Sequence, residues 1–174
     1  VIFNSAGLNP AVTLSAITNI RTMFLYGGNY TLGPAVSPVL TWSDTGGFSQ
    51  LGSGSVAVSN TITAAGNLTF NGTGTGAITL SGPITCTGTW DKFNQSDVSL
   101  ASAFTTSSTS TNALRVRAGN LLLSGNGSVT LGAGAQVGIG FSTVYQVARF
   151  HDTSGAAIVL DNTGTNNIDR ISDR

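Results

Sequence analysis

The most informative stretch of the chain is Gly-Ser-Gly-Ser-Val-Ala-Val at residues 52–58, where two glycines precede apolar residues at alternate positions. It returns as Gly-Thr-Gly-Ala-Ile-Thr-Leu at residues 74–80, and again as Gly-Asn-Gly-Ser-Val-Thr-Leu at residues 125–131. Alternating apolar residues, several of them β-branched, predict short strands, and the glycines predict the turns that precede them. The recurrence therefore predicts a repetitive, all-β structure.

A second motif supports the repeat. The sequence Ala-Gly-Asn-Leu occurs at residues 65–68 and 118–121, and each copy leads through a glycine-rich turn into a Gly-x-Gly strand. We therefore expect a unit of two short strands that forms one coil of a β-solenoid, with Gly and Asn at the corners, where Gly supplies the positive φ angles. With about 22 residues per coil and about 4.8 Å between coils, the chain would form roughly eight coils, about 38 Å long.

Three regions depart from this repeat. Residues 1–50 contain three of the four prolines and no clear copy of the unit, so we expect a strand or cap region there. Residues 51–174 form the expected repeat-bearing β region, in one continuous domain with the first. Within it, residues 91–117 carry a Ser/Thr-rich run at 105–111, which predicts a loop or lateral insertion rather than a coil.

The composition excludes several classes of protein. Charged residues make up 8% of the 174 residues, against about 25% in an average domain, and the net charge is zero. Gly, Thr, Ser and Asn make up nearly half of the chain, and there is no Glu, which argues against a helical bundle. The lack of basic surplus argues against nucleic-acid binding, and no apolar run is long enough for a membrane helix. A hydrophobic content of 40% argues against disorder.

The repeats resemble a known family. Gly-Asn-Leu-Thr-Phe at residues 66–70, Gly-Asn-Leu-Leu-Leu at 119–123 and the Asn-rich stretch at 161–173 are similar to autotransporter-associated β-strand repeats. The resemblance implies a right-handed β-helix in a bacterial cell-surface or secreted protein, with a structural or adhesive role and no catalytic residues. Because the chain begins at Val1, we expect a piece of a longer product.

Few residues could carry catalysis. His151 and Asp152, with Ser154 nearby, resemble parts of a hydrolase, but adjacent strand residues point to opposite faces. Two carboxylate pairs have the composition that sugar cleavage needs, namely Asp91 with Asp97 and Asp161 with Asp169. We expect these acids to serve in turns and caps.

Oxygen ligands for calcium cluster at Asp161, Asn162, Asn166 and Asp169, but their spacing matches neither an EF-hand nor the nonapeptide calcium repeat. The lone Cys86 predicts a small buried side chain and no internal disulfide. The sequence thus predicts no catalytic, cofactor-binding or metal site.

Two surface features remain. Thr-x-Thr pairs begin at residues 61, 73, 87, 109 and 163, among others, and the intervals between these five do not fit one coil length, which argues against an ice-binding threonine ladder. Arg115 and Arg117 lie on one strand face, where like charges repel. They predict an exposed edge, or a contact with the acidic groups of a partner.

The leading hypothesis is a non-enzymatic, extracellular β-solenoid that acts as a stalk, scaffold or adhesive surface. Its partners would be further copies of itself, neighbouring repeats of a longer chain, or surface glycans. The first alternative is a β-sandwich or jelly-roll filament subunit that donates a strand from residues 1–3 or 12–20 to the next subunit. The second is a carbohydrate-binding module or carbohydrate-active enzyme that uses exposed Trp42, Trp90 and Tyr145.

Overall fold

The chain folds as a stack of short parallel strands. The computed structural model describes residues 2–4, 11–13, 18–33, 39–110, 112–133, 135, 137–139 and 148–152. None of these residues is helical, and they include no helix long and apolar enough to cross a membrane.

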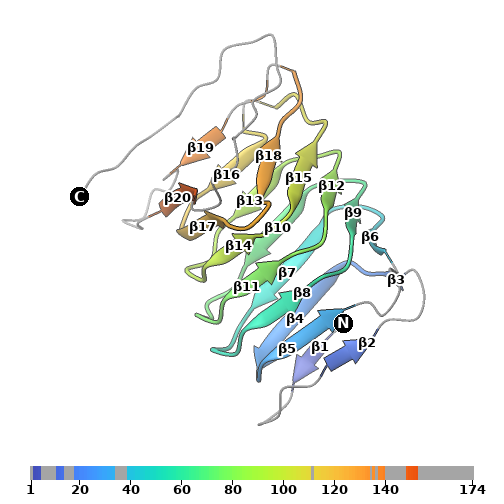
Figure 1. Ribbon diagram of the computed structural model, residues 1–174, viewed down its shortest axis with the longest axis vertical. Coiled ribbons are helices and arrows are strands. Elements are labelled where there is room, and N and C mark those ends of the chain that lie inside the picture. Colours follow the sequence, from blue (N-terminus) through green and yellow to red (C-terminus); the bar gives the residue numbers. More distant parts are fainter. Residues whose placement is uncertain are drawn as a thin grey trace.

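Each coil contributes one strand to each of three parallel sheets (Figure 1). Seven strands form sheet A, in the order β1 (Ile2–Asn4), β4 (Thr22–Gly27), β7 (Gly46–Gln50), β10 (Leu68–Asn71), β13 (Trp90–Lys92), β16 (Leu114–Val116) and β19 (Val137–Ile139). Sheet B is β2 (Ala11–Thr13), β5 (Tyr30–Gly33), β8 (Val56–Val58), β11 (Ile78–Leu80), β14 (Val98–Leu100), β17 (Gly119–Leu123) and β20 (Ala148–Asp152). Sheet C is β3 (Thr18–Asn19), β6 (Leu40–Trp42), β9 (Ile62–Ala64), β12 (Ile84–Cys86), β15 (Ala103–Thr106) and β18 (Ser128–Thr130).

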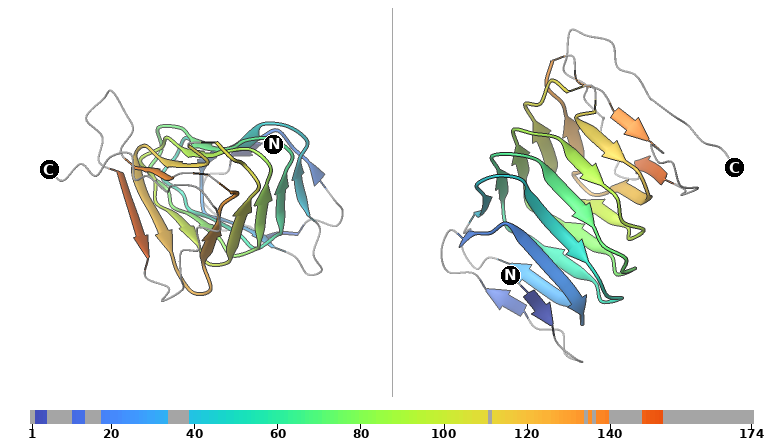
Figure 2. Two further views of the ribbon diagram at one scale, coloured as in Figure 1. Left: turned by 90° about the horizontal axis from the view of Figure 1, so that it is seen from above. Right: turned by 180° about the vertical axis from the view of Figure 1, so that it is seen from behind.

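This architecture confirms the predicted all-β solenoid and excludes the β-sandwich alternative. Every strand pair is parallel and joins one coil to the next, whereas sandwiches are built from antiparallel strands. Figure 2 shows the three sheets wrapping around one interior. The described residues place seven strands in two of the sheets, compared with the roughly eight coils expected, and each full coil has three strands where the sequence suggested two.

The predicted repeat is confirmed at its clearest point. Val56 and Val58 lie directly beside Ile78 and Leu80 in sheet B, so the first two copies of the motif stack in register. The third copy does not join them, because Val129 lies beside Phe104 in sheet C. The same alternation of inward apolar and outward polar residues suits all three sheets, so similar sequences can occupy different sheets.

The expected insertion at residues 91–117 is instead part of the stack. Residues 90–106 contribute β13, β14 and β15, and residues 114–116 form β16. The Ser/Thr-rich run itself overlaps a strand only at Thr105 and Thr106, the last residues of β15, and its other described residues form a loop, as expected. Phe104, just before the run, is fully buried. On the N-terminal side, the described strands of residues 1–50 belong to the same three sheets.

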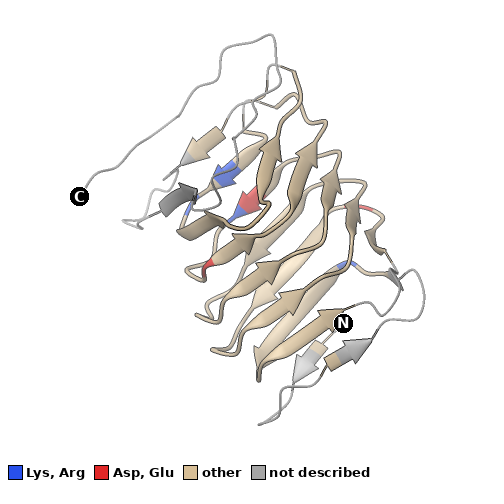
Figure 3. Cartoon of the chain, in the orientation of Figure 1, with Lys and Arg blue, Asp and Glu red and all other residues tan. Residues whose placement is uncertain are grey.

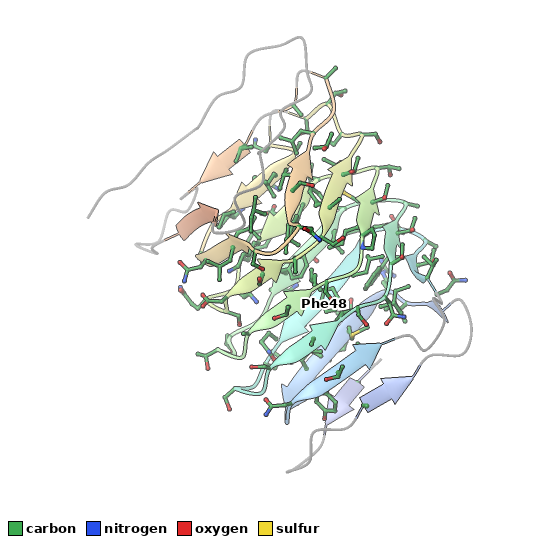
Figure 4. The ribbon with its side chains drawn as sticks, viewed as in Figure 1. Phe48 is labelled. Carbon is green, nitrogen blue, oxygen red and sulfur yellow. The ribbon has the colours of Figure 1, made fainter. Side chains whose placement is uncertain are left out.

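A row of aromatic side chains fills the interior. Ring centroids are 5.5 Å apart between Trp42 and Phe48, 5.2 Å between Phe48 and Phe70, 5.0 Å between Phe70 and Trp90, and 4.6 Å between Trp90 and Phe104. All five side chains are fully buried, and Figure 4 shows Phe48 within the coil. Aromatic contacts at these separations stabilise a core beyond the area they bury.

In its first two copies the Gly-x-Gly motif forms the corner between sheets A and B. An added Cβ at Gly54 would overlap the carbonyl oxygen of Gly28 in the preceding coil, and one at Gly76 would overlap that of Gly54. The sequence suggested that these glycines supply positive φ angles, but neither has one in the structure. They are required because backbone packs directly on backbone where the coils turn.

This contact predicts the effect of a single methyl group. Gly76→Ala is expected to lower the free energy of unfolding by about 2–3 kcal/mol, because the corner must open to admit the Cβ. Chemical denaturation followed by circular dichroism measures the change. The neighbouring exposed Thr75→Ala is the matched control and should change stability by less than about 0.5 kcal/mol. Equal effects of the two substitutions would contradict the stacking argument.

Candidate functional site

Among the described residues, three charged side chains lie together on the outer side of sheet A, on β13 and at β16 (Figure 3). Asp91 on β13 lies in register with Arg115 on β16, and Arg117 follows at the end of the same strand. We call Asp91, Arg115 and Arg117 the arginine clamp. The neighbouring residues on this face are uncharged, for example Thr69 beside Asp91 and Gly138 beside Arg115.

One carboxylate holds both guanidinium groups of the clamp. Nε of Arg117 donates to Oδ1 of Asp91 at 2.9 Å, its Nη2 donates to Oδ2 at 3.2 Å, and Nη2 of Arg115 also contacts Oδ2. The Asp91 side chain is only 4% exposed, while the arginines are about one-fifth exposed. Arg117 also stacks on the exposed ring of Phe93, 4.4 Å from its centroid.

The clamp identifies the acidic partner of the two arginines. The carboxylate that they require is supplied by the preceding coil of the same chain, where Asp91 lies beside Arg115 in the neighbouring strand. Sequence inspection missed this pairing, although the coil length connects the two positions. These contacts can stabilise the pairing of β13 with β16. Because two arginines share one carboxylate, one surplus positive charge remains on this face.

Lys92 lies beneath this face, fully buried in the interior. Its Nζ donates to the main-chain oxygens of Asn94 and Ala118, each at 2.7 Å, and so joins two successive coils. Burial lowers the pKa of Lys92 to about 8, and the nearby negative charge of Asp97 opposes this shift.

A second ordered array lies on the outer face of sheet C. Five threonines stack in register on successive coils, and we call them the threonine ladder: Thr41, Thr63, Thr85, Thr105 and Thr130. Thr63, Thr85 and Thr105 are exposed, and the two end members are half-buried. The Thr-x-Thr search missed the ladder because only one threonine per coil belongs to it. An apolar residue followed by threonine also occurs on the other two sheets, at Leu68-Thr69 and Ile78-Thr79, so the ladder becomes visible only once the strands are assigned to their sheets.

Of the carboxylate pairs considered in the sequence, only Asp91 with Asp97 lies within the described residues, and its two members have different partners. Asp91 is bound in the clamp on sheet A, whereas Asp97, which precedes β14 of sheet B, accepts a hydrogen bond from Nδ2 of Asn120 at 2.6 Å. His151 and Asp152 lie in β20, beside Leu122 and Leu123 of β17. The remaining candidates lie outside the described residues: Ser154, Asp161, Asn162, Asn166 and Asp169.

Two further predictions can be judged. Cys86 is buried as expected, and burial raises the pKa of its thiol, against a smaller opposite effect of the hydrogen bond with Thr106. The carbohydrate-binding alternative requires exposed tryptophans, but Trp42 and Trp90 are both fully buried in the aromatic row. Tyr145 lies outside the described residues.

The described part of the chain contains no group of three or more His, Cys, Asp or Glu side chains placed to hold a metal ion. The chain matches no protein family, no curated protein and no solved structure at a significant level.

Removing the shared carboxylate tests the clamp. Asp91→Asn should lower the free energy of unfolding by about 3 kcal/mol, because two partly buried guanidinium groups lose their counter-charge. Added salt should reduce this loss by screening the repulsion between Arg115 and Arg117. Denaturation at low and high ionic strength measures both effects. Asp44→Asn, at an exposed corner, makes the same charge change and should have little effect; a loss independent of salt for Asp91→Asn would argue against charge repulsion.

The buried lysine predicts a pH dependence. Between pH 8 and 10.5 the unfolded chain retains the Lys92 proton while the folded chain releases it, so stability should rise with pH across this window, by up to about 3 kcal/mol. Denaturation of the wild type and of Lys92→Met across this range measures the effect. The variant should lack this rise. The opposing contribution of Cys86 is common to both proteins and cancels in the difference, so parallel pH profiles would refute the assignment.

Proposed function

We propose that this chain is a non-enzymatic structural element, a β-solenoid scaffold or stalk whose partners are neighbouring repeats or other copies of itself. The observation that carries the proposal is the use of polar side chains to join one coil to the next. Oδ1 of Asn29 accepts a hydrogen bond from the backbone nitrogen of Ser55 at 2.8 Å, and Oδ1 of Asn67 accepts one from that of Thr89 at 2.9 Å.

Other polar groups serve the same purpose. Oγ of Ser96 donates to the carbonyl oxygen of Gly74 at 2.8 Å, and Lys92 and the arginine clamp each connect consecutive coils. Groups that an enzyme would present to a substrate are here committed to holding the stack together. This arrangement favours a mechanical or scaffolding role over catalysis.

An extracellular location is part of the proposal. It is supported by the resemblance of the Gly/Asn corners to autotransporter-associated repeats and by the small, neutral, Thr-, Ser- and Asn-rich surface. A neutral solenoid lacks the charge repulsion that normally separates exposed strand edges, so stacking of end coils into filaments is a natural mode of assembly.

The alternatives have less support. The segments proposed as donated strands contain β1, β2 and β3, and these pair with β4, β5 and β6 of the same chain. A glycan platform built on Trp42 and Trp90 loses its basis because both rings are buried.

Electron microscopy of the purified chain tests the proposed assembly. We expect regular fibres whose axial repeat is a multiple of about 4.8 Å, the spacing between coils. Deleting residues 1–20 removes β1, β2 and β3 but leaves β4, β5 and β6 to form the next end coil, so the fibres should persist. Loss of fibres on this deletion would instead favour strand donation, and single particles that cleave a polysaccharide would refute the structural role.

A further inference from the structure

The threonine ladder differs from the equivalent outward columns of the other two sheets. On sheet A the corresponding column reads Gly47, Thr69, Asp91, Arg115 and Gly138 along five coils. On sheet B it reads Thr31, Ala57, Thr79, Ser99 and Leu122. Sheet C alone keeps one residue type over five successive described coils, from Thr41 to Thr130, and Asn19 of β3 ends the row beside Thr41. A general preference of threonine for strands would act on all three sheets, so it does not explain the ladder.

The ladder hydroxyls also differ from other threonine hydroxyls at or near the ends of the sheet C strands. Oγ1 of Thr87 donates to the carbonyl oxygen of Ala65 at 2.6 Å, and Oγ1 of Thr106 donates to that of Gly88 at 2.6 Å. None of the five ladder hydroxyls bonds to another protein group within the described residues. The ladder therefore presents a row of donors and acceptors to whatever lies outside the sheet.

The surroundings of the ladder are uniform in chemical terms. The residues two positions before and after its three central members are small or uncharged: Thr61, Pro83, Ala103, Ala65, Thr87 and Ser107. In Figure 3, β9, β12, β15 and β18 carry no charged residue. Sheet C also keeps an unbroken register from β6 to β18, so the threonines repeat at about 4.8 Å over about 19 Å.

We propose that the threonine ladder binds ice. A row of identical hydroxyl and methyl groups at a fixed spacing can hold water molecules at regular positions, with each hydroxyl making one or more bonds to the lattice. The absence of charge matters, because a charged side chain binds its own hydration shell strongly and is costly to strip of it. The ligand is thus a crystalline water surface, and this activity is independent of the proposed scaffold role.

The test measures the shaping of single ice crystals and the inhibition of ice recrystallisation by the full chain. The wild type should facet growing crystals and slow recrystallisation. Thr85→Tyr places a bulky ring at the centre of the ladder and should abolish both effects. Thr79→Tyr is the matched control, since Thr79 occupies the equivalent outward position on β11 of sheet B, and it should keep wild-type activity.

Two further measurements make the result decisive. Circular dichroism and thermal unfolding should be alike for both tyrosine variants, and Thr63→Val, which removes one hydroxyl but keeps the shape, should weaken the effect on ice. The proposal is wrong if the wild type leaves ice growth unchanged, or if Thr79→Tyr loses activity as fully as Thr85→Tyr. The proposal is equally wrong if the wild type has no effect on ice and the only effect of Thr85→Tyr is to convert a dimer to a monomer. In that case the ladder face binds a second copy of this chain.

Discussion

The structure depends on hydrogen bonding between each coil and the next at a nearly constant register. Phe48, Phe70 and Lys92 occupy equivalent places on successive strands of sheet A, at equal intervals along the chain. Such pairing stacks like positions on like positions, so inward residues form columns and corners must fit over corners. The glycines of the Gly-x-Gly corner follow from this constraint, since a side chain there would occupy the place of the adjacent backbone.

The same constraint accounts for the low charge of the sequence. Any charged residue at a repeated outward position would lie about 4.8 Å from its copy in the next coil, where like charges repel. The arginine clamp shows the exception that this rule permits. Asp91 faces Arg115 across the coil boundary, so the stacked charges are opposite in sign. Neutral threonine, serine and asparagine avoid the problem elsewhere.

Much of the fold was predictable from local patterns. Alternation indicated the strands, the copies at residues 52–58 and 74–80 indicated the coil length, and the apolar neighbours of Cys86 indicated its burial. Relations between coils were harder to predict. The third copy of the motif lies in a different sheet, because the three sheets share one pattern of inward and outward residues. The clamp and the threonine ladder join residues that are one coil apart, and coil lengths vary enough to obscure them.

Lys92 shows how that variation is accommodated. In the regular coils, Val56 follows Phe48 by eight positions and Ile78 follows Phe70 by eight, which leaves room for the Gly-x-Gly corner. Val98 follows Lys92 by only six positions and Leu121 follows Val116 by five, so the corner shortens. In the coil with the first shortened corner, Lys92 takes the inward position that Phe48 and Phe70 occupy in the preceding coils. Its ammonium binds one carbonyl oxygen from each of the two shortened corners. The cost of burying that charge is offset by satisfying carbonyl groups that the shorter turns would otherwise leave unpaired.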